Sequence, residues 1–383
     1  MNEEIIVDTN KDTIEVEKDS RAKKVRNFLM TTLNGMTMGL FATLIIGTIF
    51  EQFGILLGSY GISELILVVA KTLKSSLGMG IGIGVAISLK LDWFKVIVSG
   101  SIGLIASSFK IVFGQDQILL YGNQLGALSV NLDPLTIYLV VIGTILLMNL
   151  ILVKKTPIDI LLIPFLGVIL ATILTLLLSG PTGFIIYYIA EFVNVSTKAV
   201  PFLMVVVISV SMGMILTGPI SSAAVAFMIS IGTNPLAAAA AIIGTSTQMV
   251  GFAVQSRKDN KIGTVLAVGL GTSMLQFKNV VKKPLIWLPT IIASAILAPS
   301  VLLFNFDTTA ATDVIANAWT LGSGMGTSGL VGQFASFNAL GLRDYRVWLF
   351  VLLLQIIGPI LLVYIIDLLF RKHGLIKVGD LEV

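Results

Sequence analysis

The stretch "VWLFVLLLQIIGPILLVYIIDLLF", residues 347–370, decides the fold class. An apolar run of about 20 residues is long enough to cross a bilayer as a helix, and this run exceeds that length. A second run, "LTIYLVVIGTILLMNLILV" at 135–153, nearly reaches it. The whole chain agrees, because 56% of its 383 residues are hydrophobic and 12% are charged, against roughly 25% charge in soluble domains. The alternating strands of a membrane barrel are absent, so the sequence predicts an all-α integral membrane protein.

Outward from 347–370, further apolar segments predict about ten transmembrane helices, with shorter apolar pieces between them that predict broken or re-entrant segments. Non-helical backbone is tolerated at membrane depth only where protein buries it or where it lines a water-filled cavity. Interrupted segments of this kind therefore point to the binding site of a transporter. The predicted spans cover 28–50, 55–73, 77–91, 94–113, 135–153, 157–179, 200–217, 235–254, 284–304 and 347–370, and the shorter pieces cover 218–232, 262–277 and 319–340.

Basic residues indicate the orientation of the chain in the membrane. The segment "RAKKVR" precedes the first span and "RKH" follows the last, which predicts that both termini are cytoplasmic. We therefore assign the formal net charge of +4 to orientation and not to nucleic-acid binding. The first 20 residues carry mixed charge with seven acids, a composition typical of disorder. The sequence predicts a disordered cytoplasmic tail at 1–26, a transmembrane domain at 27–372 and a cytoplasmic C-terminal tail at 373–383.

Residue types that usually carry catalysis are scarce. The chain has no cysteine, which excludes thiolate metal ligands and cysteine nucleophiles. Its single histidine, His373, follows the last span. No paired carboxylates, zinc-ligand spacing or nucleophile–base arrangement occurs in the sequence. We therefore predict no catalytic residue, no metal and no cofactor in this chain.

The stretch "GSGMGTSGLVGQ", residues 322–333, contains five glycines and no charge. Gly324, Gly326 and Gly329 have G-x-G-x-x-G spacing, but a dinucleotide site also needs a preceding strand and an acid about 20 residues later. Neither is present, so we interpret the stretch as a re-entrant loop that dips into the membrane and returns. Its exposed amides and polar side chains could then contact a polar solute. The alternative is close helix packing by small residues.

A second broken segment reads "GMILTGPISSAA", residues 213–224. Gly218 and Pro219 interrupt the helix, and two serines follow at the start of the next one, where backbone amides are unpaired. Half-helix ends of this kind hold polar solutes in transporters. The two segments supply the predicted substrate-binding residues Thr217, Ser221, Ser222, Gly326, Thr327, Ser328 and Gln333. A proline kink with capping serines is the alternative.

Few polar residues lie inside the apolar spans. An ionisable residue within a span is a functional candidate by default, which applies to Glu64 in "GISELILVV". Its alternative role is an interfacial ion pair with Lys71. Asn34 and Gln248 lie inside other spans, and these three residues complete the predicted substrate-binding set.

Five separated motifs in the same order resemble the membrane protein family of enzyme IIC of the bacterial phosphotransferase system, including its perfringolysin-regulator-like and toxin-regulator members. The resemblance covers roughly residues 25–372. The motifs are "NGMTMGLFATLIIGTI", "LTGPISSAA", "TQMVGFAVQS", "GLGTSMLQF" and "GMGTSGLVGQ".

The resemblance implies an enzyme IIC-type permease in the bacterial cytoplasmic membrane that moves a sugar or a related polar metabolite by alternating access. It further implies re-entrant hairpins that hold the solute, a homodimer in the lipid bilayer, and separate IIA and IIB subunits that phosphorylate the sugar. Two alternatives stay open at this point. One is a membrane-bound ligand sensor or regulator, and the other is an ion-coupled transporter of another solute class.

Overall fold

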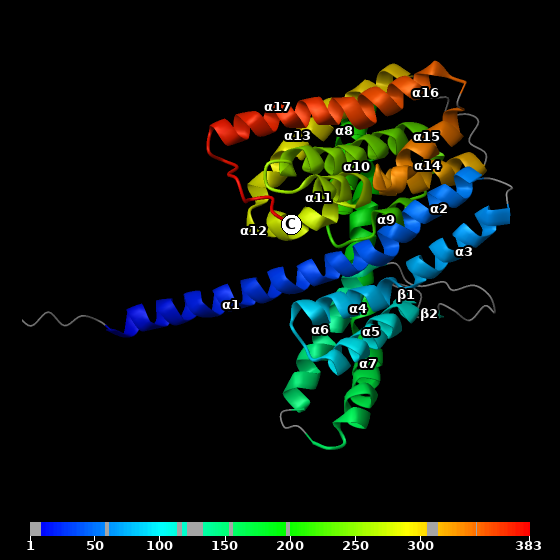
Figure 1. Cartoon of the computed structure of the whole chain (residues 1–383). Coiled ribbons are helices and arrows are strands. Elements are labelled where there is room, and N and C mark those ends of the chain that lie inside the picture. The colour runs from blue at the N-terminus through cyan, green and yellow to red at the C-terminus, as the bar shows by residue number, and fades with distance from the viewer. Residues whose placement is uncertain are drawn as a thin grey trace, which may run out of the picture.

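A computed structural model describes residues 9–57, 61–112, 117–120, 133–152, 156–196, 200–304, 313–341 and 343–383 of the chain (Figure 1). Seventeen α-helices and one short antiparallel strand pair form this part of the protein. The helices are α1 (Thr9–Leu40), α2 (Ile46–Leu57), α3 (Gly61–Ser75), α4 (Leu77–Ser88), α5 (Trp93–Ser108), α6 (Pro134–Ile151), α7 (Asp159–Ser196), α8 (Pro201–Thr217), α9 (Ser222–Met228), α10 (Pro235–Ser256), α11 (Ile262–Leu266), α12 (Phe277–Lys282), α13 (Leu288–Leu297), α14 (Asp313–Met325), α15 (Val331–Leu340), α16 (Tyr345–Leu349) and α17 (Gly358–Lys372), and the strands are β1 (Phe109–Val112) and β2 (Gln117–Leu120).

The helices form two bodies. In the N-terminal body, α1, α4, α5, α6 and the first half of α7 share one apolar core. In the C-terminal body, α8, α10, α14 and the segments after α17 pack around three further cores. Helix α7 belongs to both bodies, because its second half packs on α8, and Figure 1 shows it running from the lower body towards the upper one.

Glycines allow very close helix contacts inside the N-terminal body. A Cβ atom added at Gly39 of α1 would lie 2.0 Å from the carbonyl oxygen of Gly80 of α4. The same test at Gly35, one turn earlier, places a Cβ 2.4 Å from the Gly84 oxygen. Both helices thus use small residues four positions apart to bring their backbones together, as membrane helices commonly do.

The predicted count of ten spans is not confirmed. In the described residues, six helices are long and apolar enough to cross a membrane, and a seventh span results if α3 and α4, bent by 50°, count as one. Apolar run length cannot show such bends, and it cannot show where a helix continues. Helix α7 runs on to Ser196 through Pro181, so 180–196, which lies beyond the predicted span 157–179, is helical. The six helices span Lys23–Glu51, Pro134–Ile151, Asp159–Ser196, Pro235–Ser256, Pro284–Phe304 and Tyr345–Lys372.

The two broken segments fold as predicted from their glycines and proline. Helix α8 ends at Gly218, and Ser221 then caps α9 by accepting a hydrogen bond from the Ala224 amide. Helices α14 and α15 form a hairpin of 13 and 10 residues. Its turn contains Gly326 and Gly329, whose φ angles of +53° and +54° are readily adopted only by glycine.

The structure also describes residues 9–26 of the predicted N-terminal tail and the whole of 373–383. Residues 9–26 continue into the membrane domain as part of α1, so the helix passes through the boundary predicted at residue 27. Glu, Lys and Arg are good helix formers, which explains how a charged segment can extend an apolar helix. At the other end, Ile376 and Leu381 are buried in the core beneath α10 and α12. The C-terminal segment 373–383 therefore packs against the transmembrane domain. Between the predicted spans 94–113 and 135–153, the structure describes the strand pair of β1 and β2, whereas 113–116 and 121–132 lie outside the described residues.

Candidate functional site

A cavity of about 100 Å³ lies between the two bodies. The N-terminal body contributes Leu44, Thr48 and neighbouring residues, and the C-terminal body contributes both broken segments. Three of the predicted site residues, Ser221, Ser222 and Ser328, line it. We call this space the central cavity. Its position means that any movement of one body against the other changes its size and its access to solvent.

The two broken segments meet at this cavity. The hydroxyl of Ser222 donates a hydrogen bond to the carbonyl of Gly324, which joins the start of α9 to the end of α14. Gly324 is required at this contact because a Cβ atom there would lie 2.4 Å from the Cα of Ala223. The segments 213–224 and 322–333 therefore lie side by side in the structure, and their binding of one solute stays a prediction.

Ser328 differs from Ser222 in having an unused hydroxyl. It is 1% exposed and lines the central cavity, yet within the described residues no group forms a hydrogen bond with its Oγ. A buried polar group without a partner is costly, and native structures usually supply one. The geometry thus leaves the Ser328 hydroxyl available to a polar molecule inside the cavity.

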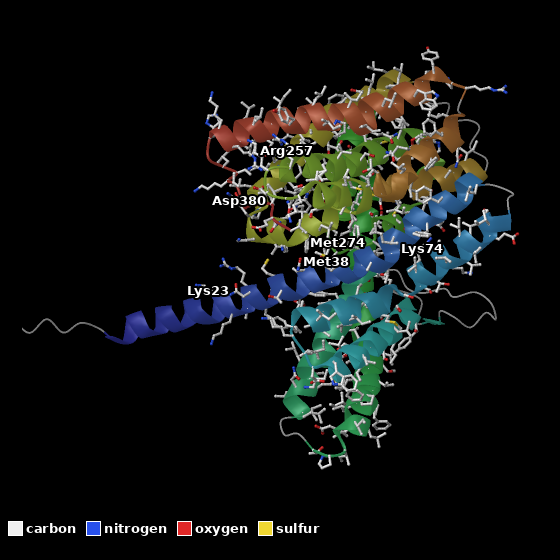
Figure 2. The ribbon with its side chains drawn as sticks, viewed as in Figure 1. Lys23, Met38, Lys74, Arg257, Met274 and Asp380 are labelled. Carbon is white, nitrogen blue, oxygen red and sulfur yellow. The ribbon has the colours of Figure 1, made fainter. Side chains whose placement is uncertain are left out.

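An ion pair that the sequence did not reveal forms part of the same wall. The Lys74 Nζ lies 2.8 Å from both carboxylate oxygens of Glu51, and the two side chains are 26% and 30% exposed. Both residues line the central cavity, and Figure 2 shows Lys74 on α3, which lies beside α2. Glu51 directly follows the first predicted span, so sequence reading assigns it to a loop end. The two residues are 23 positions apart in the sequence, so sequence reading does not reveal that they pair.

Thr217 and Gln248 lie beside the cavity in a buried polar network and do not line it. The Gln248 Oε1 accepts hydrogen bonds from Trp287 Nε1 at 3.0 Å and from Thr290 Oγ1 at 2.9 Å. Thr217 contacts Gln248 at 3.4 Å and Ser273 at 3.0 Å. This network ties α8, α10 and α13 together, so its direct effect is on the shape of the C-terminal body.

Gly326 and Thr327 pack against the rest of the body. A Cβ atom at Gly326 would lie 2.7 Å from the backbone of Thr245 and Ser246, and Thr327 donates a 2.6 Å hydrogen bond to the Gly269 carbonyl. These contacts favour the packing interpretation for this half of the turn. Gln333 donates to Gln355 at 2.8 Å within a buried pair of amides, and it does not line the central cavity.

The remaining two candidates lie elsewhere. Asn34 lines a second, larger cavity near one end of α1. Glu64 is exposed on α3 and lines neither of the two cavities. The ten predicted residues therefore do not form one site.

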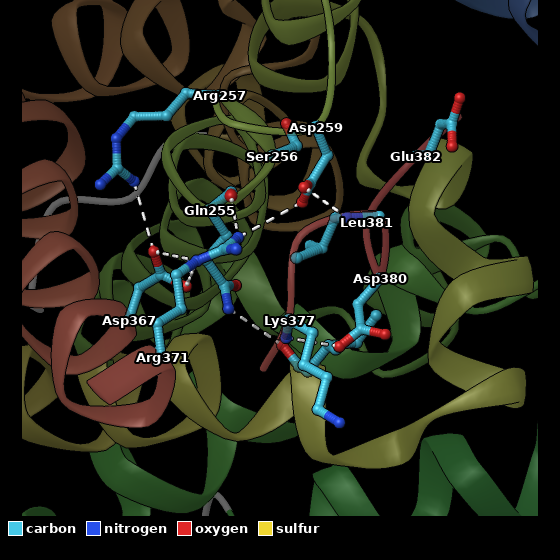
Figure 3. A network of polar contacts seen from close by, with 12 residues as sticks. Gln255, Ser256, Arg257, Asp259, Asp367, Arg371, Lys377, Asp380, Leu381 and Glu382 are labelled. Atoms are coloured by element: carbon cyan, nitrogen blue, oxygen red, sulfur yellow. Dashed lines mark hydrogen bonds and ion pairs between the residues drawn. The ribbon is translucent and has the colours of Figure 1, made fainter. Parts of the chain in front are cut away.

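The C-terminal segment forms part of the same end of the molecule as that second cavity. Figure 3 shows Arg371 of α17 contacting Asp367 and Asp259, and Leu381 lying against the turn after α10. The Asn260 amide donates to the Leu381 carbonyl at 2.7 Å, and the Gly379 amide donates to Asp259 at 2.7 Å. These bonds join the end of α10, α17 and the C-terminal segment into one unit.

Comparison with known families agrees with this architecture. Residues 30–383 match the family described as "Phosphotransferase system, EIIC". The chain belongs to this family. The EIIC match includes the C-terminal segment as well as the helices, in line with its packing. No curated protein and no solved structure matches the chain.

Membership establishes a multi-pass membrane permease of the phosphotransferase type. It also implies a carbohydrate substrate and separate IIA and IIB components. An EIIC protein supplies the membrane passage, so the features that matter in this chain are the cavities between its bodies and the groups that line them.

Proposed function

We propose that this EIIC-family protein carries a sugar or a closely related polyol by alternating access, with the central cavity as the solute site. The observation that supports it most directly is the unpartnered Ser328 hydroxyl beside the Glu51–Lys74 pair, between the two bodies. A carboxylate accepts and an ammonium donates hydrogen bonds, so this wall suits a molecule whose hydroxyl groups do both. The apolar residues around it match the mostly hydrophobic lining of ligand sites.

The small volume of the cavity supports a mechanism in which the two bodies move relative to each other. Sites for small ligands usually enclose about 300–1,000 Å³, whereas the central cavity holds about 100 Å³. Admission of a sugar would therefore need the two bodies, which share α7, to move relative to each other.

Ser328→Ala should weaken solute binding about 3- to 100-fold, because one hydrogen bond to the solute is lost and its partner on the solute is left unsatisfied. The melting temperature should stay unchanged, since no described residue depends on that hydroxyl. Ser323→Ala is the matched control. Ser323 lies on the same hairpin, bonds to the Trp319 and Ala238 carbonyls and does not line the cavity. Calorimetric titration of the solute measures both variants, and equal affinity in Ser328→Ala and wild type would remove Ser328 from the site.

Transport itself is tested with purified protein in proteoliposomes and a panel of labelled sugars. We expect uptake of at least one sugar, increased when IIA and IIB components and a phosphate donor are enclosed in the vesicles. Binding without uptake would contradict the permease mechanism and favour the sensor alternative. Uptake that requires an ion gradient would favour the ion-coupled alternative. A homodimer remains a prediction from the family resemblance, to be measured by the mass of the protein in detergent.

Both termini should face the cytoplasm. Arg26 of α1 and Glu382 of the C-terminal segment line the same cavity, so the middle of α1 and the C-terminal segment lie at one end of the molecule, which is rich in lysine and arginine. Single cysteines replacing Lys23 or His373 in this cysteine-free chain should resist an impermeant thiol reagent in intact cells. A cysteine replacing Arg343, between α15 and α16, is the control that should react. Reaction at Lys23→Cys or His373→Cys before permeabilisation would reverse the orientation.

A further inference from the structure

A second cavity of about 600 Å³ opens between α1 and the end of the C-terminal body. Helix α1 contributes Arg26 and Asn34, α12 contributes Lys278 and Lys282, and the C-terminal segment contributes Glu382. Figure 2 shows Lys23 of α1 and Asp380 of the C-terminal segment, both left of the centre of the view, on either side of this region. We call this space the basic cavity.

The charges that line the basic cavity are unbalanced. Arg26, Lys278 and Lys282 are cationic, and Glu382 is the acidic side chain among the lining residues. Within the described residues, none of the three cations forms an ion pair with a carboxylate group. Neighbouring Lys283, which does not line the cavity, is by contrast paired with Asp380 at 2.6 Å. The three cations that line the cavity thus form no direct ion pair within the described residues, and the Glu382 carboxylate acts on Lys278 only from a longer distance.

Lys278 occupies the most enclosed position of the three. Its Nζ has one long hydrogen bond, 3.4 Å, to the Oδ1 of Asn34. Burial lowers the pKa of the Lys278 ammonium below its ordinary value of 10.5, and the nearby Glu382 carboxylate acts in the opposite direction. An ammonium group has three donors, so at least two are free to bond a ligand. Because Asn34 accepts through its oxygen, its amide nitrogen also stays available as a donor.

The walls of the basic cavity are held in place from both sides. On α1, the contact of Gly35 with Gly84 sets the position of neighbouring Asn34. On the other side, the Asn279 amide donates to the Glu382 carbonyl at 3.0 Å, and the Gln276 amide donates to the Leu381 carbonyl at 2.9 Å. The cations are therefore presented by anchored elements, which lowers the entropy that ligand binding must overcome.

From this arrangement we propose that the basic cavity is a binding site for a phosphate-type oxyanion. An arginine guanidinium and two lysine ammonium groups offer several charged donors to the several acceptor oxygens of one phosphate, and charge-assisted hydrogen bonds are about twice as strong as neutral ones. The volume lies in the range of small-ligand sites. A phosphate group could come from a phosphorylated solute, from free phosphate or from an anionic lipid headgroup. The first source rests on the proposed function, and the site itself does not.

The test is calorimetric titration of the full chain in a maltoside detergent with inorganic phosphate and with glucose 6-phosphate. We expect saturable binding that weakens as salt rises, because screening shortens from about 10 Å at 0.1 M to about 3 Å at 1 M. Lys278→Gln and Arg26→Gln should each weaken binding roughly 10- to 100-fold. Lys261→Gln, at an exposed lysine of the same end that does not line the cavity, should have no effect. Melting temperatures check that the variants are folded.

The sources are separated by two further measurements. Tighter binding of glucose 6-phosphate than of glucose and inorganic phosphate would assign a phosphorylated solute. Loss of phosphate binding in phosphatidylglycerol nanodiscs, but not in phosphatidylcholine nanodiscs, would assign a lipid headgroup. Ser328→Ala should leave phosphate binding intact, so failure of the solute site and failure of the basic cavity give different results. No saturable binding of either probe, or equal binding in Lys278→Gln and wild type, would overturn the proposal.

Discussion

Asp367→Asn should destabilise the protein by about 3–5 kcal/mol, the usual effect of removing one partner of a buried ion pair. The Asp367 side chain is fully buried, and both of its oxygens lie 3.0 Å from the Nε of Arg371. Arg257 approaches the same carboxylate at 3.3 Å. Asparagine keeps the shape but removes the charge, so two arginines lose their common partner. Because Asp259 still contacts Arg371 at 3.3 Å, we expect the lower end of the range.

The measurement is the melting temperature of the purified protein in detergent. Asp344→Asn is the matched control, because Asp344 also pairs with an arginine, Arg346, but on the exposed surface at 2.7 Å. Surface pairs contribute little, and asparagine caps a helix as well as aspartate, so this control should melt as wild type does. Equal melting temperatures in Asp367→Asn and wild type would show that the ion cluster does not hold α17 to α10.

Gly326→Leu should abolish both folding and solute binding. Leucine in the left-handed conformation costs about 1–2 kcal/mol, and overpacking a closed contact typically costs about 1–3 kcal/mol more. The contact is closed here, since even a Cβ atom would lie 2.7 Å from the backbone of Thr245 and Ser246. The hairpin turn would have to move, and Ser328 would leave the cavity with it.

Gly341→Leu separates the two causes. Gly341 also has a positive φ angle, +84°, but nothing lies within 4 Å of the place where its Cβ would be. This control should fold with a modest loss of stability, whereas Gly326→Leu should give little monodisperse protein in size-exclusion chromatography. Equal loss in both variants would mean that backbone strain, and not the close contact with α10, requires glycine at 326.

Sequence reasoning predicted the two broken segments well because their signals are local. A proline removes a helical hydrogen bond wherever it stands, and a run of glycines permits a tight turn in any surroundings. The turn predicted within 319–340 and the break at Gly218 followed from those properties. The number of spans did not follow, because the bend between α3 and α4 and the continuation of α7 past Pro181 depend on what packs beside them.

The candidate site was predicted less completely. Ser221, Ser222 and Ser328 line the central cavity, but Gln248 and Gln333 have hydrogen-bond partners that only the fold brings near. Glu51 and Lys74 were missed for the same reason, since they face each other across α2 and α3. Asn34 was selected as an isolated polar residue, and it acquires a chemical context only beside Lys278, 244 positions later.

Membrane location and helical class follow from the chain's own residues, because the free energy of transferring an apolar helix into a bilayer is a sum over residues that are neighbours in sequence. Family membership also follows from them, because the family motifs are recognised by their order along the chain. Which hydroxyl stays unpaired, which cations lack a carboxylate and where a cavity opens are decided by tertiary packing. Those properties depend on distances between residues far apart in the chain. Such distances are set by contacts as close as that of Gly39 with Gly80, where two backbones meet with no side chain between them.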